Sequence, residues 1–341
     1  MSKVSSYKKI GTIDDFFKDA NIKKLNEERK KITLDGTIKL HGACAGVSFD
    51  GNDIRYQSKD GLIEGYKGHF GFRGFMERYG KNMMKFFEYL IETYQIDIDK
   101  NIITIYGEFC GDNIQNSDIG LVNLPKCFVM FDAKVTNKVI ESGEDNIKNP
   151  YKKINMKNEN NKCIISDPKN NIYNIYDFPT YQIEVDLKNP QKSHEEIMEL
   201  TYQVEKECPF TKSFGKSGGG EGIVWRFWED SGLCITYKSK GNKHSVRNTE
   251  FLKARGGIVK SAQDFATAFC TKNRFDQFVT KMFTADEKVP TSKDIPILVN
   301  TIFQDAIQEE IQNSEYIDTQ ETFDKFAGAI RKMFFEKYPK E

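Results

Sequence analysis

A short run near the start of the chain, Thr37-Ile38-Lys39-Leu40-His41-Gly42, places a lysine just before a histidine and a glycine. A neutral lysine amine can attack an activated phosphate, but the usual lysine pKa of about 10.4 keeps the amine protonated at neutral pH. Neighbouring cations or a metal ion would lower that pKa. Taken alone, Lys39 is more simply a solvated strand lysine, so its importance depends on the residues that follow it.

Four more short motifs follow Lys39 in order. They are Tyr106-Gly107-Glu108-Phe109-Cys110-Gly111, Phe128-Val129-Met130-Phe131-Asp132, Glu221-Gly222-Ile223-Val224 and Lys238-Ser239-Lys240. They supply a carboxylate on an apolar strand, an aromatic–aspartate pair, a second carboxylate and two cations. Carboxylates suit Mg²⁺, and lysines stabilise the charge that develops on phosphoryl oxygens. Together the motifs contain the groups needed to transfer a nucleotidyl group.

The last two motifs are predicted to lie on one β-hairpin, with strands at 221–228 and 233–240. If Trp228 pairs with Leu233, Ile223 lies opposite Lys238 and Glu221 lies opposite Lys240. Cross-strand partners share a face of the sheet, so this register predicts Glu221, Lys238 and Lys240 on one face. The alternative is a surface Glu–Lys pair that contributes little to stability.

The composition is that of a folded protein, with 38% hydrophobic and 13% aromatic residues among 341. Fifty basic residues balance fifty acidic ones, which argues against a bulk nucleic-acid packaging protein. The seven cysteines show no Cys-x-x-Cys pair and no zinc-ligand spacing, as expected for reduced thiols. With no apolar run of roughly 20 residues and a polar N-terminus, we expect an intracellular, cytoplasmic protein without a membrane contact.

The apolar spacing predicts two domains, residues 1–250 and a small helical domain over 258–341, with a boundary near 248–258. In the first domain we expect helices at 12–30, 75–95 and 193–207, the last with Ser193 as N-cap. Strands are expected over 32–59, with turns at Asp35-Gly36 and Asp50-Gly51, and at 102–109 and 127–135. Residues 141–172, rich in Asn, Lys and Asp, are expected to form an exposed insertion.

The five ordered motifs, spread over about residues 30–245, resemble those of the covalent nucleotidyltransferases. Within these enzymes they resemble the RNA ligase 2 family of bacteriophage and kinetoplastid RNA-editing ligases. The resemblance implies an α+β fold: a nucleotidyltransferase (ATP-grasp-like) domain of antiparallel sheets flanked by helices, plus the all-helical domain. It also implies an ATP-dependent RNA ligase that joins 3′-hydroxyl and 5′-phosphate ends through lysyl-AMP and RNA-adenylate, with Mg²⁺ or Mn²⁺.

The resemblance assigns a role to individual residues. Lys39 would be the nucleophile, Glu108 would contact the ribose and Phe131 would stack on adenine. The implied catalytic residues are Lys39, His41, Lys238 and Lys240, and the implied metal ligands are Asp132 and Glu221. The implied nucleotide-binding residues are Ile38, Lys39, Leu40, Lys59, Glu108, Phe131, Glu221, Lys238 and Lys240. We further expect Lys238 and Lys240 to lower the pKa of Lys39.

The expected partner is RNA, most simply a nicked duplex and otherwise an RNA–DNA hybrid. We expect the protein to be a monomer. It would act in the cytoplasm or, if it is a viral protein, in the cytoplasm of the host. Lys243, His244 and Arg247 form a basic cluster suited to phosphates, and Lys253, Lys260, Lys272 and Arg274 of the helical domain would add a second contact.

One feature supports the RNA ligase 2 branch, and two others depart from the family pattern. His41 stands where DNA ligases and capping enzymes carry aspartate, which favours the RNA ligase 2 branch. Ala43-Cys44 replaces the Thr-Asn of the phage-type motif, and Lys59 stands for an arginine, which loses bidentate phosphate contact. The alternatives are a GTP-dependent mRNA-capping guanylyltransferase, which would carry an OB-fold, a nick-sealing DNA ligase, and a catalytically inactive RNA-binding relative.

Overall fold

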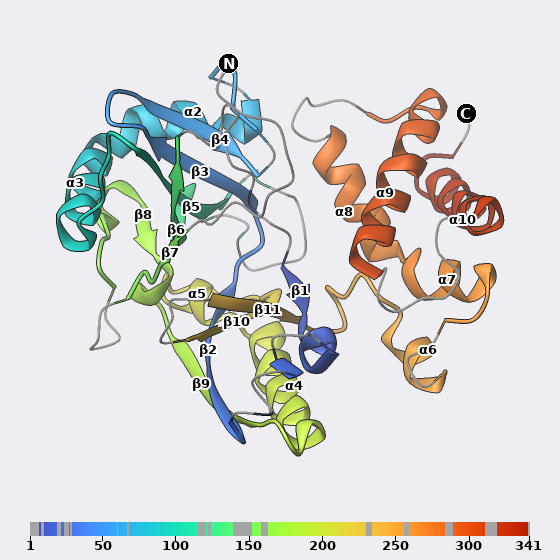
Figure 1. Cartoon of the computed structure of the whole chain (residues 1–341). Coiled ribbons are helices and arrows are strands. Elements are labelled where there is room, and N and C mark those ends of the chain that lie inside the picture. Colours follow the sequence, from blue (N-terminus) through green and yellow to red (C-terminus); the bar gives the residue numbers. More distant parts are fainter. Residues whose placement is uncertain are drawn as a thin grey trace. The chain divides into compact units, whose positions relative to one another are not determined.

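The computed structural model divides the chain into two compact units, residues 1–239 and 240–341 (Figure 1). The structure describes residues 7, 10–18, 22–23, 27, 29–59, 61–66, 68–112, 114, 121, 124–138, 152–157, 163–229, 234–255, 259–283, 289–310 and 319–339. The predicted boundary near 248–258 falls inside the second unit, so the division comes earlier in the chain, directly after Ser239.

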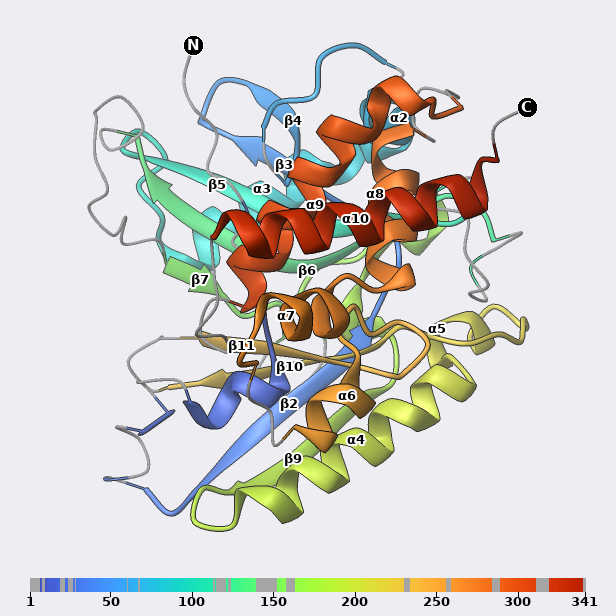
Figure 2. The same ribbon diagram turned by 90° about the vertical axis from the view of Figure 1, so that its right-hand side faces the viewer.

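The first sheet has the strand order β1-β11-β10-β2-β9. Its strands are β1 (Gly11–Thr12), β2 (Lys31–Lys39), β9 (Thr180–Asp186), β10 (Gly222–Trp228) and β11 (Cys234–Lys240). Helix α4 (Pro190–Lys206) packs along one face (Figures 1 and 2). Ile38, Trp225 and Tyr237 of the sheet and Ile197 of α4 are buried in one core, so this face is apolar.

The second sheet has the order β4-β3-β5-β6-β7, with β8 pairing to β6. Its strands are β3 (Ala43–Phe49), β4 (Ile54–Ser58), β5 (Asn101–Cys110), β6 (Cys127–Asn137), β7 (Lys152–Ile154) and β8 (Ile172–Asn174). Helices α2 (Gly68–Tyr79) and α3 (Met83–Tyr94) pack on one face, burying Phe72 and Phe87 against Val47 and Ile105. The shorter elements are η1 (Ile13–Lys18), η2 (Gly80–Asn82), η4 (Pro168–Asn170), η5 (Ile175–Asp177) and α5 (Pro209–Lys212).

Polar side chains link the opposite faces of the two sheets. Arg226 Nε of β10 lies 3.8 Å from Asp132 Oδ1 of β6. Lys153 Nζ of β7 donates to Thr236 Oγ1 of β11 at 3.3 Å. Lys157 Nζ, just after β7, donates to Asp35 Oδ2 of β2 at 2.8 Å. The first unit therefore has an apolar core under the helices of each sheet and a layer of charged groups between the sheets.

The predicted strands at 102–109 and 127–135 are confirmed as β5 and β6. The predicted turn at Asp35-Gly36 is wrong, because β2 runs through it without a break. Gly36 serves packing instead: a Cβ atom there would lie 2.7 Å from a ring carbon of Trp225. The glycine leaves room for the large indole to approach the strand closely.

Three other predictions need correction. The helix expected at 75–95 is interrupted by η2, and residues 13–18 of the expected helix at 12–30 form η1. Helix α4 begins at Pro190, so Ser193 is not its N-cap; its hydroxyl accepts a hydrogen bond from the Asp186 N–H at 3.1 Å. The expected insertion at 141–172 contains β7, and Ile154 is 2% exposed, so that part belongs to the core. Residues 141–151 lie outside the described residues.

The second unit is helical, as predicted. Its elements after β11 are α6 (Thr249–Ala254), α7 (Ala262–Phe269), α8 (Lys272–Phe283), η7 (Ser292–Asp294), α9 (Ile295–Glu310) and α10 (Gln320–Lys337). Helix α10 packs on α7 and α9 (Figure 2), and Phe265, Phe303 and Phe326 meet in the core. Within the described part of the chain, no helix combines the length and the apolarity needed to cross a membrane.

Candidate active site

Lys39, His41 and Glu221 meet in the structure although 182 positions separate Lys39 from Glu221 in the chain. Lys39 Nζ donates to Glu221 Oε2 at 2.5 Å, and the Leu40 carbonyl lies 3.5 Å from the same amine. His41 Nδ1 lies 3.5 Å from the same Oε2. The side chain of Glu221 is only 4% exposed, whereas that of Lys39 is 21% exposed. One buried carboxylate therefore contacts two of the predicted catalytic residues.

A glycine turns Glu221 toward Lys39. Gly222, the first residue of β10, pairs with Lys39 of β2 and has a φ of 148°. Strict alternation would place residue 221 on the apolar face, on the side of Leu40. The positive φ, which residues other than glycine rarely adopt, lets Glu221 face Lys39 instead. In this motif the glutamate supplies the carboxylate, and the glycine supplies the backbone conformation that directs it toward Lys39.

The hairpin register predicted from the sequence is wrong by an odd number of residues. Trp225 Nε1 donates to Ser239 Oγ at 2.9 Å, and Trp225 shares a core with Tyr237. Odd-numbered residues of β10 and β11 therefore lie on one face, which excludes the pairing of Ile223 with Lys238. The apolar side chains decide the register because a slip of one residue would move them all out of the core.

The corrected register keeps Lys238 on the same face as Lys39. Lys39 pairs with Gly222 and therefore shares its face of the sheet. Lys238 stands between Tyr237 and Ser239, which point into the core, so its side chain lies on the other face of β11, the face of Lys39. Lys240 ends β11 and is the first residue of the second unit. Its contribution to the site stays a prediction.

The pKa of Lys39 shifts in the direction opposite to our expectation. Burial lowers the pKa of Lys39, but the negative charges of Glu221 and Glu108 outweigh burial and hold it above its usual value. The hydrogen bond to Glu221 acts in the same direction. Without bound substrate, Lys39 is therefore a protonated ammonium ion and not a nucleophile.

A β-bulge in β6 places Phe131 and Asp132 on the same side of the sheet. Tyr106 pairs with Asp132, but the next residue, Gly107, pairs with Met130, so Phe131 is the additional residue. Met130 is buried with the helices α2 and α3, whereas Phe131 packs against the core of the first sheet. Such bulges redirect a side chain next to functional sites. The aromatic–aspartate pair is aimed between the sheets because of this irregularity.

Asp132, predicted to ligate a metal, is held by protein groups in the structure, and its role as a metal ligand stays a prediction. The Tyr7 hydroxyl donates to its Oδ2, Lys153 Nζ lies 3.3 Å from the same oxygen, and Arg226 lies beside Oδ1. The side chain is 1% exposed. Burial raises the pKa of Asp132, but the charges of Lys153 and Arg226 and the Tyr7 hydrogen bond hold it below its usual value. Asp132 is an ionised carboxylate that links the two sheets.

Tyr7 contacts several of the predicted site residues, which the sequence did not reveal. Its ring lies 5.4 Å from that of Phe131 and 4.9 Å from that of Tyr106, and its N–H donates to the Lys59 carbonyl at 3.0 Å. The Lys134 ammonium lies 4.7 Å from the Tyr7 ring centre. Tyr7 thus touches Phe131, Asp132 and Lys59, three residues of the predicted site. It lies in a polar segment with no periodicity, so no local signal could have identified it.

The other predicted nucleotide-binding residues are placed as follows. Ile38 and Leu40 are 2% and 6% exposed in the core of the first sheet, so only their backbone could contact a nucleotide. Glu108 is half-buried and pairs with Cys44 of β3. Lys59 is also half-buried; burial raises the pKa of Cys44, and the nearby Lys59 charge opposes that rise. Glu108 and Lys59 therefore lie near Cys44, one of the two residues that replace the Thr-Asn of the phage-type motif.

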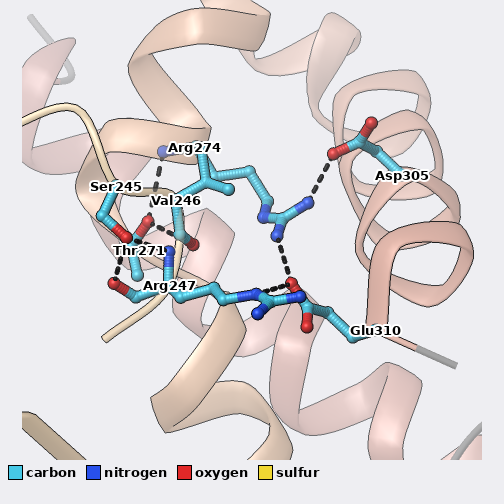
Figure 3. A network of polar contacts seen from close by, with 7 residues as sticks. All are labelled: Ser245, Val246, Arg247, Thr271, Arg274, Asp305 and Glu310. Carbon is cyan, nitrogen blue, oxygen red and sulfur yellow. Dashed lines mark hydrogen bonds and ion pairs between the residues drawn. The ribbon is translucent and has the colours of Figure 1, made fainter. Parts of the chain in front are cut away.

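Arg247, predicted to bind RNA, is buried in an ion pair of the second unit and not exposed. Its guanidinium is 6% exposed and bonds to Glu310, which is fully buried. Arg274, also expected to contact RNA, is fully buried and contacts Asp305 and Glu310 (Figure 3). Both arginines are structural ions of the second unit. Lys243 is exposed and His244 is half-buried, so their proposed role is unaffected.

The carboxylates of the site differ in how well they could bind a metal ion. Among the residues that the structure describes, no three His, Cys, Asp or Glu side chains cluster as a ready-made metal site. Mg²⁺ usually binds proteins through one or two carboxylates and completes its shell with water and substrate phosphates. Glu221, beside Lys39, fits that mode, whereas Asp132 is already held by protein groups.

A protein-family model described as RNA ligase matches residues 35–240, which include every motif from Lys39 to Lys240. The chain belongs to the RNA ligase family. The family assignment agrees with the order of motifs and with the two antiparallel-rich sheets. No curated protein sequence matches the chain.

Solved structures of Naegleria gruberi RNA ligase are similar to this RNA ligase family member. A lysine-to-alanine variant solved with ATP and Mn is 14% identical, with a TM-score of 0.42, over 71% of this chain and 59% of that chain. The structure with PPi is 13% identical, with a TM-score of 0.42, over 75% of this chain and 60% of that chain. The chain thus spans about three fifths of the length of these ligases.

Proposed function

We propose that this protein is an ATP-dependent RNA ligase that joins a 3′-hydroxyl to a 5′-phosphate at nicks in duplex RNA. The observation that carries the proposal is the contact of Lys39 with buried Glu221, flanked by His41. A buried ion pair is costly unless it is well compensated, so its retention at a partly exposed lysine points to a chemical role.

In the first step, the neutral amine of Lys39 attacks the α-phosphorus of ATP. The bond from that phosphorus to the bridging oxygen breaks and pyrophosphate leaves, while a phosphorus–nitrogen bond forms lysyl-AMP. The Lys39 ammonium must first lose a proton, because its pKa in the free protein lies above the usual value. Binding that draws the charge of Glu221 away from Lys39 would lower this pKa and produce the nucleophile.

Glu221 is our proposed ligand for Mg²⁺ or Mn²⁺, and the ion would supply neutralisation of phosphate charge when bound. Lys238 and Lys240 would bind the phosphates as positive charges, and Phe131 would stack on adenine with its ring orientation set by the β6 bulge and by Tyr7. Glu108 would accept hydrogen bonds from the ribose. AMP would then pass to the RNA 5′-phosphate, and the 3′-hydroxyl would displace it to seal the strand.

The structure offers one observation against the capping alternative. An OB-fold is a small β-barrel, whereas the described elements that follow β11 are helices. The inactive RNA-binding alternative is less favoured because the Lys39–Glu221 contact is intact.

The direct test is the sealing of a nicked RNA duplex with a labelled 5′-phosphate at the nick. We expect sealing with ATP and Mg²⁺ and none with GTP. The RNA-adenylate should accumulate when the 3′-hydroxyl is replaced by hydrogen. Transfer of GMP to a 5′-diphosphate end would instead identify a capping enzyme.

A further inference from the structure

The eight residues Gly241–Asn248, called here the connecting segment, follow β11 and precede α6. Helices of the second unit fix its backbone by several hydrogen bonds. Asn273 Nδ2 donates to the carbonyls of Lys243 at 2.8 Å and Ser245 at 2.9 Å, Thr271 Oγ1 donates to the Val246 carbonyl at 3.0 Å, and the Asn248 N–H donates to the Ala268 carbonyl at 2.7 Å. The connecting segment is therefore built into the helical unit rather than being a loose linker.

A buried ionic network completes the attachment (Figure 3). Arg247 Nε donates to Glu310 Oε1 at 2.8 Å, and Arg274 Nη2 lies 3.4 Å from the same oxygen. Arg274 also contacts Asp305. The side chains of Arg274 and Glu310 are fully buried, and that of Arg247 is 6% exposed. Glu310, the last residue of α9, therefore joins α8 and the connecting segment.

The network keeps Arg247 inside the unit. Moving its guanidinium to an RNA phosphate would take a contacting cation away from the buried carboxylate of Glu310, which is strongly unfavourable. Lys243 precedes Arg247 by four residues and is exposed, and His244 is half-buried. The bonds from Asn273 act on the carbonyls of Lys243 and Ser245, on either side of His244. The anchored part of the connecting segment thus surrounds the two proposed RNA-binding residues.

We propose that Glu310 and Asn273 are positioning residues for RNA joining. They hold the connecting segment in one conformation, so that Lys243 and His244 are presented to the phosphates of the nicked duplex before RNA binds. A segment that is already ordered loses less conformational entropy on binding, so its order strengthens RNA affinity without a direct contact. The inference rests on the proposed RNA ligase function and assigns two residues to it that make no contact with substrate.

The test compares full-length Glu310→Gln and Asn273→Ala with a matched control, Asp276→Asn. Asp276 lies on the same helix as Asn273, α8, but accepts from the surface lysines Lys272 and Lys337, each at 2.7 Å. The substrate is a nicked duplex RNA whose 5′ end already carries AMP, so that sealing does not depend on lysine adenylation. We expect the KM for this RNA to rise about tenfold in both variants, with the rate of lysyl-AMP formation from ATP unchanged. Asp276→Asn should behave like the wild type.

A double-mutant cycle with Lys243→Ala distinguishes positioning from a general loss of structure. If Glu310 acts through Lys243, the KM of Glu310→Gln combined with Lys243→Ala should be no higher than that of the worse single variant. The inference would be overturned if the fold-increase in KM of the double variant equalled the product of the two single increases. An unchanged KM in both Glu310→Gln and Asn273→Ala would also overturn it. If Glu310→Gln does not fold, the same cycle with Asn273→Ala decides the question, because that substitution removes only hydrogen bonds to the segment. A wild-type protein that neither captures AMP nor seals RNA would instead contradict the proposed function.

Discussion

Lys39 Nζ donates a 2.5 Å hydrogen bond to Oε2 of Glu221, a carboxylate that is only 4% exposed. The bond stabilises the protonated form of the lysine, so the free protein holds its proposed nucleophile in an unreactive state. A nearby cation that attracts Glu221 would weaken this hold. Glu221 can thus suppress the amine before ATP binds and, as the proposed ligand of a divalent ion, would act on the phosphates only through that ion.

The first prediction concerns the pKa of Lys39. Because Glu221 and Glu108 raise it above the usual lysine value, reaction of Lys39 with an amine-acylating reagent should increase with pH beyond the point where ordinary lysines level off. Glu221→Gln removes the larger raising charge while burial still favours the neutral amine. The pKa of Lys39 should therefore fall, and Lys39 should react faster at neutral pH. Peptide mass spectrometry over a pH series measures both quantities.

Lys31 provides the internal control for this experiment. It begins β2, the strand that Lys39 ends, and pairs with Glu184 at 2.6 Å on the surface. Its reactivity should be the same in wild type and Glu221→Gln. An unchanged or higher pKa of Lys39 in the variant would show that Glu221 does not restrain the amine.

The second prediction concerns Asp132. Asp132→Asn should destabilise the folded protein by about 3–5 kcal/mol, because it leaves Arg226 and Lys153 buried beside a neutral group. Urea unfolding at pH 7 in the presence of a chelator measures this. Asp97→Asn, which removes an exposed partner of Lys100, should change stability by under ~1 kcal/mol. If Asp132 were a metal ligand with no structural role, its substitution would leave metal-free stability unchanged.

The pH dependence of this contribution has a definite sign. The pKa of Asp132 is lowered in the folded protein. Its ionisation therefore stabilises the fold above the pKa of an unfolded aspartate, about 3.9, and this contribution is lost as the pH falls toward the lower folded value. In Asp132→Asn, the loss of stability on acidification should be smaller than in the wild type.

The third prediction concerns Gly36. Gly36→Ala should destabilise the first sheet by about 1–3 kcal/mol, because the added methyl group overlaps the buried Trp225 ring, 2.7 Å away. Gly328→Ala on α10 is the control, since a Cβ built there meets no described atom within 4 Å apart from its chain neighbours and the backbone of its own helix. It should be neutral or stabilising by about 0.5–1 kcal/mol. Equal effects of the two substitutions would mean that Gly36 is not needed for packing.

Much of the fold followed from the pattern of apolar residues. The sequence predicted β5 and β6 because both are short, continuous apolar runs rich in β-branched and aromatic residues. It predicted the helices of the second unit because their apolar residues recur at helical spacing. The prediction of a turn at Asp35-Gly36 was wrong because this glycine makes room for the indole of Trp225. Trp225 is far away in the sequence, so no local pattern indicates the contact. The hairpin register failed for a similar reason: the choice of pairing depends on which side chains enter the core with α4.

The candidate site was predicted in its residue types but not in its electrostatics. The motifs named Lys39, His41 and Glu221, and the structure brings them together. The position of Phe131 and Asp132 depends on a bulge, and Tyr7 reaches Asp132 from 125 residues away, so neither could be read from spacing. Arg247 appeared basic and available in sequence, but its partner Glu310 lies 63 residues further on.

The proposed ligase reaction depends on a covalent bond between Lys39 and AMP. The measurement is the intact mass of the protein after treatment with pyrophosphate and then incubation with ATP and Mg²⁺, in wild type, Lys39→Ala and Lys31→Ala. We predict one added AMP in wild type and in Lys31→Ala, and none in Lys39→Ala. AMP retained in Lys39→Ala, or absent from the wild type, would contradict the role of Lys39 as the nucleophile.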